Sequence, residues 1–329
     1  MEVLRIMLTL GLTLLGCTEN ELVVHDGTDV FYQSPPQEVD ILLVVDDSCS
    51  MQPYQQKLSK NFSEFITFFD EANILWHIGV TTTDIKGDNA GQLANAFITW
   101  EDADAQERFE DAVNVGIDGY YHEAGLHAAW MALENPNNQA FLRPDASLSL
   151  IFVSDEEDVS PWPVHEYTNR FYSKKGGTTR DAVNASAVVV TDVSTCENQS
   201  RTGDRYLEMA EQTNGVIGNI CEDNFADIVT ELSLNASRLM DTFELSGMPN
   251  PATLAVSVES EELDCAEGHF TYDVIQNEEG EDVAIIVFDI DSLPQPSQQI
   301  AIRYYDGDGN PESFCEGADA TSDDTGGGQ

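Results

Sequence analysis

The sequence predicts an α/β domain with a doubly wound, mainly parallel sheet, followed by a small antiparallel β module. Over the first two thirds of the chain, short apolar runs alternate with amphipathic stretches of helical period. This is the pattern of buried parallel strands joined by helices. Three of these runs, 39–46, 148–155 and 185–192, end on aspartate. After a boundary at 245–251, the remaining segments are short and alternate in polarity, which is typical of antiparallel strands.

The first elements can be placed from their apolar patterns. The run VDILLVVD at 39–46 is apolar almost throughout, so it is predicted to be a strand buried on both faces. The segments 74–83 and 96–100, separated by a turn rich in Gly, Asp and Asn, predict a hairpin. A helix between the first strand and this hairpin is predicted from apolar residues three and four positions apart: Leu58, Phe62, Phe65, Ile66 and Phe69.

The rest of the chain continues the alternation. The predicted elements of the α/β domain are helices at 105–114 and 122–134, strands at 148–155 and 185–192, and helices at 204–213 and 223–240. The β module is predicted from four alternating segments: ATLAVSVES, FTYDVIQ, VAIIVFD and QIAIRYYD. The resulting organisation is a lipoprotein signal peptide at 1–16, a tether at 17–36, the α/β domain at 37–242, the β module at 249–316 and a disordered acidic tail at 317–329.

The first seventeen residues predict export and anchoring. Their apolar core, Leu8 to Leu15, is too short to span a bilayer. The sequence Leu14-Leu15-Gly16-Cys17 resembles the lipobox of bacterial lipoproteins. This resemblance implies an envelope protein, periplasmic or surface-exposed, whose only membrane attachment is a lipid on Cys17. Thr18 in place of Asp implies sorting to the outer membrane. The alternative is an ordinary secretory peptide with an incidental cysteine.

The charge balance excludes one class of partner. Among 329 residues, 60 are acidic and 14 are Lys or Arg, which gives a formal net charge of −46. Binding a nucleic acid requires clustered cations that neutralise phosphates, so no nucleic-acid partner is predicted. A solvated, self-repelling surface is the plain interpretation of this acidity, and attraction of divalent cations is the functional one.

A cation site is predicted where two of the buried strands, 39–46 and 148–155, end on aspartate. Asp46, Ser48 and Ser50 occupy alternate positions after the first strand, and Asp155 ends the second. The carboxyl ends of parallel strands share one edge of the sheet, where ligands of such sheets bind. Hard cations such as Mg²⁺ or Ca²⁺ prefer carboxylate and hydroxyl oxygens. Because Ser and Asp are also ordinary helix caps, a metal-free helix start is the alternative.

With these residues, the segment 37–242 resembles a von Willebrand factor type A domain. The resemblance rests on VVDDSCSM, GIDGYYHEAGL and IFVSDEED and on the order of strand, helix and hairpin. It implies a metal-ion-dependent adhesion site at Asp46, Ser48, Ser50 and Asp155, with the serines bound directly and the aspartates often through water. That family also supplies a threonine from a middle loop. Here Gly116 precedes Ile117 instead, so Asp118 or water is the candidate for that position.

No catalytic constellation is found. The segment HEAGLH at 122–127 has its histidines five residues apart, which places them roughly 140° apart on a helix, so they cannot share one zinc ion. Glu123 is therefore interpreted as a polar neighbour of the loop and not as a base. The sequence has no Gly-x-Ser-x-Gly and no phosphate-binding Gly loop with Lys. The protein is predicted not to be an enzyme.

The cysteines indicate an oxidising compartment. Cys196 and Cys221 flank a predicted helix, and Cys265 and Cys315 bracket the β module, so these pairs are the candidate disulfides. Cys49, between the two site serines, is predicted to be a free, buried thiol.

The function expected from these features is binding or adhesion. A carboxylate on a protein or glycan ligand would complete the coordination of the cation, and the ligand itself cannot be read from the sequence. The alternative is a structural or assembly factor of the cell surface that has the same fold and needs no metal.

Overall fold

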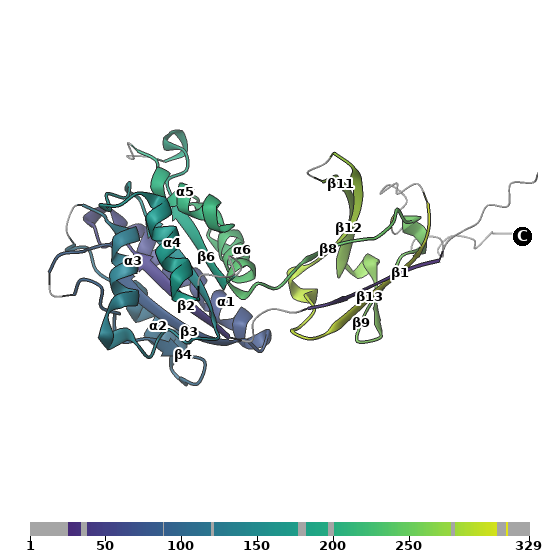
Figure 1. The fold of residues 1–329 in the computed structure, drawn as a ribbon, viewed down its shortest axis with the longest axis horizontal. Coiled ribbons are helices and arrows are strands. Elements are labelled where there is room, and N and C mark those ends of the chain that lie inside the picture. Colours follow the sequence, from purple (N-terminus) through teal and green to yellow (C-terminus); the bar gives the residue numbers. More distant parts are fainter. Residues whose placement is uncertain are drawn as a thin grey trace, which may run out of the picture.

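The computed structural model describes residues 26–33, 38–87, 89–119, 122–176, 182–196, 201–277, 280–307 and 314. Figure 1 shows two bodies beside each other: an α/β domain with a central sheet, and a smaller body of antiparallel strands. The predicted fold class is therefore confirmed. The predicted signal peptide, Cys17 and the tail at 317–329 lie outside the described residues. Within the described part of the chain, no helix is long and apolar enough to cross a bilayer.

The central sheet of the α/β domain has six strands in the order β4-β3-β2-β5-β6-β7. Their bounds are β2 (Glu38–Val45), β3 (Leu75–Thr82), β4 (Ile98–Thr99), β5 (Ser147–Ser154), β6 (Val183–Val189) and β7 (Ile217–Asn219). All neighbours pair in parallel except β3 and β4, which form the predicted antiparallel hairpin. The short edge strand β7 was not predicted.

Helices cover both faces of this sheet. They are α1 (Gln52–Glu71), α2 (Ala105–Val113), α3 (Gly125–Glu134), α4 (Val164–Lys174), α5 (Asp204–Thr213) and α6 (Ala226–Ser237). The apolar side chains of β2 alternate between two cores: Ile41 and Leu43 pack with α1, α2 and α6, whereas Leu42 and Val44 pack with α3, α4 and α5. This alternation follows from the two-residue repeat of a strand. The apolar residues of β2 thus serve two cores, as expected of a central parallel strand.

The β module consists of two antiparallel sheets that enclose a third core. The sheets have the strand orders β1-β13-β9-β10 and β11-β12-β8. Their strands are β1 (Asp26–Tyr32), β8 (Thr242–Glu244), β9 (Ala255–Val258), β10 (Glu261–Leu263), β11 (Phe270–Gln276), β12 (Asp282–Phe288) and β13 (Gln299–Tyr305). Phe243, Tyr272 and Ile286 from one sheet pack with Val256 and Ile302 from the other.

The structure corrects the prediction of a tether over 17–36. Residues Asp26–Tyr32 form β1, which pairs with β13 along its whole length, from Asp26 opposite Tyr305 to Tyr32 opposite Gln299. Phe31 packs against the module core, with its ring centroid 5.2 Å from that of Phe243. The β module is therefore built from two parts of the chain, and the α/β domain is inserted between them (Figure 1).

Two chain segments connect the bodies, and a buried glutamine joins them. The side chain of Gln33, which follows β1, donates to the carbonyl of Met240 (2.8 Å) and accepts from its amide (3.1 Å). Leu293 of the module packs into the core of the α/β domain beneath α1 and α6. Both connections reach the α/β domain at the start of β2 and the end of α6. The carboxyl ends of β2 and β5 therefore lie at the opposite end of the domain.

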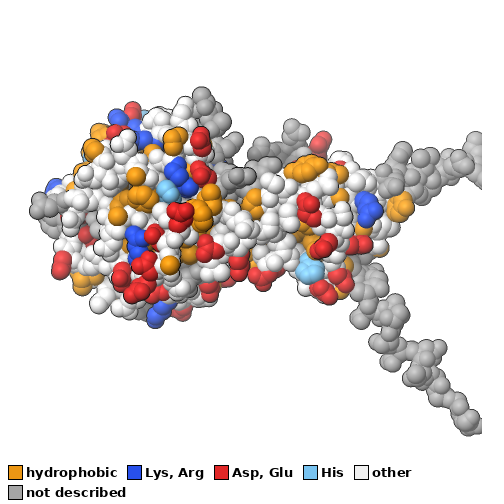
Figure 2. Space-filling view, turned by 90° about the horizontal axis from the view of Figure 1, so that it is seen from below, with side chains coloured by type: hydrophobic (Ala, Val, Ile, Leu, Met, Phe, Trp, Pro, Cys, Tyr) orange, Lys and Arg blue, Asp and Glu red, His pale blue; other side chains and the backbone are white. Residues whose placement is uncertain are grey.

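Acidic side chains are spread over both bodies. Figure 2 shows them across the viewed face, where Lys and Arg side chains are fewer. This distribution fits the net charge of −46 and agrees with a solvated, self-repelling surface.

Candidate functional site

The structure brings the four principal predicted side chains together at the carboxyl ends of β2 and β5. The Ser48 and Ser50 hydroxyl oxygens lie 3.1 Å apart, and the Ser50 hydroxyl donates to Asp155 Oδ1 at 3.1 Å. Asp46 shares the loop with the serines and accepts at Oδ1 from the Ser48 amide at 2.7 Å. The backbone amide of Asp46 donates to the Val153 carbonyl at 2.9 Å, which joins the two strand ends directly.

The serines do not cap the helix that follows them. Ser48 is the residue before a short 3₁₀ turn (Cys49–Met51), and its side chain makes no capping hydrogen bond. Met51 precedes α1, where no side-chain cap is present either. The two hydroxyls lie within hydrogen-bonding distance of each other instead, and the Ser50 hydroxyl also donates to Asp155. The alternative of an ordinary capped helix start therefore does not describe this loop.

Asp46 is fully buried and held at both oxygens. In addition to the Ser48 amide at Oδ1, Oδ2 accepts from the Ser154 hydroxyl at 2.6 Å. The pKa of Asp46 is raised to about 7, chiefly by burial; the hydrogen bonds from Ser154 and Ser48 oppose the rise, and the charge of Asp155 adds to it. A nearby positive charge would relieve both the burial cost and the repulsion between the two carboxylates.

Glu123 belongs to the same edge, although its sequence context suggested only a polar neighbour. Its side chain is 1% exposed, and its Oε2 accepts a short hydrogen bond from the Thr83 hydroxyl. Oε1 is buried without a hydrogen-bond partner. The pKa of Glu123 is raised to about 9, chiefly by burial and then by the charge of Asp46, with smaller contributions from Asp47 and Glu156 and against the opposing Thr83 bond. Only the polarity of the loop before α3 could have signalled this residue in the sequence.

Asp118 does not join the four principal residues. It lines a neighbouring cavity of about 330 Å³ together with Asp47, Asp84 and Lys86. Gly119 closes against the first loop by donating its amide to the Asp47 carbonyl at 2.9 Å, and a Cβ at this position would clash with Asp47. Burial, followed by the charge of Asp84, raises the pKa of Asp47 to about 6. The structure therefore gives no support to Asp118 as the middle-loop ligand.

The donor set fits a hard divalent cation. Asp46, Ser48, Ser50 and Asp155 offer carboxylate and hydroxyl oxygens, which Mg²⁺ and Ca²⁺ prefer. Among the residues that the structure describes, no three His, Cys, Asp or Glu side chains converge in a metal-binding arrangement. A cation at this edge would thus rely on the two serine hydroxyls and on water in addition to the carboxylates.

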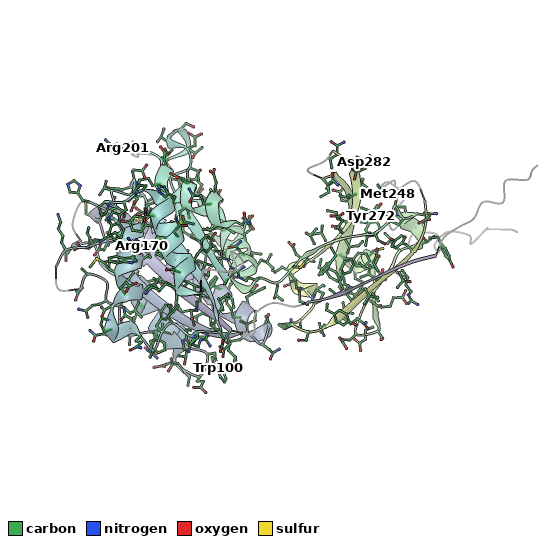
Figure 3. The ribbon with its side chains drawn as sticks, in the orientation of Figure 1. Trp100, Arg170, Arg201, Met248, Tyr272 and Asp282 are labelled. Carbon is green, nitrogen blue, oxygen red and sulfur yellow. A yellow bond between two sulfur atoms is a disulfide. The ribbon has the colours of Figure 1, made fainter. Side chains whose placement is uncertain are left out.

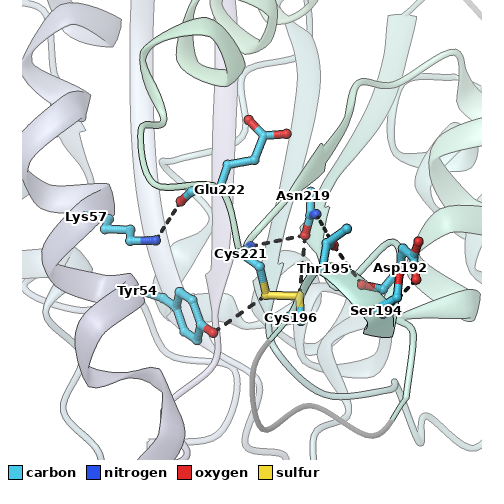
Figure 4. The surroundings of a disulfide bond; sticks show 9 residues. All are labelled: Tyr54, Lys57, Asp192, Ser194, Thr195, Cys196, Asn219, Cys221 and Glu222. Carbon is cyan, nitrogen blue, oxygen red and sulfur yellow. Dashed lines mark hydrogen bonds between the residues drawn. A yellow bond between two sulfur atoms is a disulfide. The ribbon is translucent and has the colours of Figure 1, made fainter.

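The disulfide between Cys196 and Cys221 is confirmed. Figure 4 shows it between the loops that follow β6 and β7, where the side chain of Asn219 accepts from the Cys221 amide at 3.1 Å. The Tyr54 hydroxyl of α1 lies 3.7 Å from the Cys221 sulfur. Cys265 is also disulfide-bonded. Its predicted partner Cys315 lies outside the described residues, so that pairing stays a prediction.

Cys49 carries a free thiol, as predicted, but the thiol is exposed and not buried. The 3₁₀ turn that begins at Cys49 directs this side chain to solvent, while Ser48 before it is buried. An exposed thiol therefore lies next to the candidate site.

The histidine of α3 has a structural role. His127 Nδ1 lies 2.9 Å from the Tyr167 hydroxyl, and its ring packs against Trp130 and Trp162. Arg170, labelled in Figure 3, covers the Trp162 ring at 4.3 Å. Burial lowers the pKa of His127. These contacts agree with the prediction that HEAGLH is not a zinc site.

Comparisons with known proteins give fold-level likeness only. No protein-family profile matches the sequence, and no curated protein matches it. Proximal thread matrix protein 1 from the mussel byssus is 12% identical, with a TM-score of 0.43, over 66% of this chain and 51% of that one. Another structure of the byssus protein has a zinc-occupied MIDAS motif.

Two further solved structures are similar at the same level. The pilus adhesin SpaC from Lactobacillus rhamnosus GG is 11% identical, with a TM-score of 0.46, over 86% of this chain and 41% of that one. A von Willebrand factor type A protein from Catenulispora acidiphila is 12% identical, with a TM-score of 0.41, over 90% and 68%. The chain spans about half or less of the byssus protein and the adhesin. Such distant likeness says nothing of function.

Proposed function

We propose that this chain is a binding protein of the von Willebrand factor type A kind, in which a divalent cation at Asp46, Ser48, Ser50 and Asp155 recognises a carboxylate on a protein or glycan. One observation carries the proposal: the Ser50 hydroxyl donates to Asp155 and lies 3.1 Å from the Ser48 hydroxyl, and Ser48 does not cap the helix. The cation would supply the positive charge that two buried carboxylates lack. The four side chains would fix the position of the cation, and a ligand oxygen would complete its coordination.

Thermal unfolding tests whether the cation binds. A ligand that binds only the folded state stabilises it by about 2.7 kcal/mol at a hundredfold excess over Kd. Millimolar MgCl₂ or CaCl₂ should raise the Tm of the wild type above the value in NaCl of equal ionic strength, which corrects for screening of the acidic surface. Ser48→Ala and Asp46→Ala should lose most of this rise. The exposed Ser173→Ala in α4 is the matched control and should keep it.

Equal metal responses of the wild type and Asp46→Ala would leave a metal-free structural or assembly factor as the better description. That alternative has one observation in its favour, because the serine hydroxyls already bond to each other, and the Ser50 hydroxyl to Asp155, without an ion. Capture of ligands from envelope extracts, with and without a chelator, separates the two. The binding protein should retain its ligand only with Mg²⁺ or Ca²⁺, and the structural factor should retain it in both conditions.

The proposed setting is the outer membrane, with Cys17 lipidated. The support is the lipobox-like Leu14-Leu15-Gly16-Cys17 at the end of a short apolar segment. Cys17→Ser should move the protein from the membrane fraction to the soluble fraction, or leave its signal peptide uncut. Mass spectrometry of the mature N-terminus measures the lipid directly. A wild type without that mass, found in the same fraction as Cys17→Ser, would reject the anchor.

A further inference from the structure

Glu123 is a buried carboxylate, and only one of its two oxygens has a hydrogen-bond partner. Its side chain is 1% exposed. The Thr83 hydroxyl donates to Oε2, while Oε1 has no hydrogen-bond partner. Leaving a buried polar atom without a partner costs about 1 to 3 kcal/mol, and more for a charged group. Oε1 is thus available to a positive charge or a donor that the described side chains do not supply.

The backbone contacts of this residue place it over the end of β2. The amide of Val159, in the loop after β5, donates to the Glu123 carbonyl at 2.7 Å. The amide of Ala124 donates to the carbonyl of Thr83, in the loop after β3, at 3.2 Å. Because β2 lies between β3 and β5 in the sheet, a residue joined to both of these loops must cross above the end of β2. Asp46 follows β2 at that point.

The electrostatics agree with this placement. After burial, the charge of Asp46 is the largest influence on the pKa of Glu123 and raises it. The two carboxylates are therefore close in a region with little solvent. A cation between the strand ends would interact favourably with both of them.

We infer that Glu123 is a positioning residue of the cation site and supplies the middle-loop oxygen that the absent threonine would provide. This inference rests on the proposed function. Because no three His, Cys, Asp or Glu side chains of the described residues converge in a metal-binding arrangement, we assign Glu123 a place behind the direct ligands, from which it acts through a water on the cation. Thr83 holds Oε2, and Oε1 receives the hydrogen bond of that water.

Calorimetric titration of the metal-free protein with MgCl₂ and with CaCl₂ tests the inference. Loss of a group that orients a metal's ligands lowers metal affinity roughly 10- to 100-fold. Glu123→Gln keeps the size of the side chain and should raise Kd by this factor. The control is Glu156→Gln. Glu156 is exposed, and its substitution removes the same charge near Asp155. Its Kd should change much less, by surface screening alone.

The outcomes separate this inference from the proposed function. A wild type that releases no heat of binding with either metal overturns both. A wild type that binds and a Glu123→Gln protein with the same Kd overturn the role of Glu123 only. A purely structural role predicts a lower Tm of metal-free Glu123→Gln with an unchanged Kd. If circular dichroism shows that Glu123→Gln does not fold, the Kd of Thr83→Val is measured in its place. This variant frees Oε2, and an unchanged Kd would likewise overturn the inference.

Discussion

At the scale of single residues, the site combines groups that a sequence pattern reveals with one that it hides. Asp46, Ser48, Ser50 and Asp155 could be predicted because each follows a strand whose apolar run marks its end. Parallel strands bring such ends to one edge. Glu123 could not be predicted in this way, because its position depends on hydrogen bonds to two loops that are remote in the sequence. Asp118 stays a prediction, and the structure places it in the lining of the neighbouring cavity.

The raised pKa values predict a metal-free protein that loses stability as pH rises. Asp46 has a pKa of about 7 in the folded state, against roughly 4 for an unfolded Asp. The folded state therefore binds more protons than the unfolded state between these values, and the free energy of unfolding falls across this range. Glu123, with a pKa of about 9, extends the fall to about pH 9. Urea unfolding between pH 4 and 9, in the presence of a chelator, measures it.

Asp46→Asn separates the site from the rest of the acidic surface. General repulsion among the surface carboxylates also lowers stability as pH rises, and this contribution is common to both proteins. The variant cannot ionise at residue 46, so its stability should fall less steeply between pH 4 and 7 than that of the wild type. Parallel curves for the two proteins would show that Asp46 titrates normally.

At the scale of elements, long segments with a regular apolar pattern were predicted well. The helix α4 and the strand β1, whose partner is distant in the sequence, were not predicted. The helix over 204–213 and the strand over 270–276 have the predicted bounds. α4 was missed although its buried residues, Val164, Tyr167 and Phe171, recur three and four positions apart. β1 was missed because its partner β13 lies more than 260 residues further along the chain. A seven-residue edge strand carries little signal until that partner is known.

The disulfide joins two elements at the same edge of the sheet as the candidate site, and its state can be read chemically. In the native protein, Cys196 and Cys221 should resist alkylation, whereas the exposed thiol of Cys49 should react. Reduction under denaturing conditions should expose the pair to the reagent. Peptide mass spectrometry measures each site. Native labelling of Cys196 or Cys221 would contradict the bond.

The stabilising effect of this disulfide follows from the length of the loop that it closes. The cysteines are 25 residues apart in the sequence, and cross-linking a loop of this length should contribute roughly 3 kcal/mol by the chain-entropy estimate. Cys196→Ala combined with Cys221→Ala should lower the free energy of unfolding by that amount. Cys49→Ala is the matched control, and it should have little effect because the thiol is free and exposed.

At the scale of the whole molecule, the insertion of the α/β domain into the β module determines which way the site faces. The chain enters the α/β domain at the start of β2 and leaves it after α6. The carboxyl ends of the parallel strands form the far edge of the sheet, so the candidate site lies at the end of the α/β domain opposite the module (Figure 1). With the proposed anchor on Cys17, the module would lie between the membrane and the site. This arrangement suits a protein that presents its site to external ligands.

The contribution of β1 to the module gives the last prediction. A chain beginning at Asp26 keeps β1, whereas a chain beginning at Glu38 loses its pairing with β13, the packing of Phe31 and the bond between Gln33 and Met240. Full burial of a Phe side chain is worth about 1.5 to 3 kcal/mol, and the partly buried Phe31 contributes a fraction of this. The shorter chain should therefore show rapid amide exchange in β13 and β9, while β2 and β5 of the α/β domain remain protected. Hydrogen exchange with peptide mass spectrometry measures both regions at once. If residues 26–33 were only a tether, the two truncated chains would exchange alike in β13.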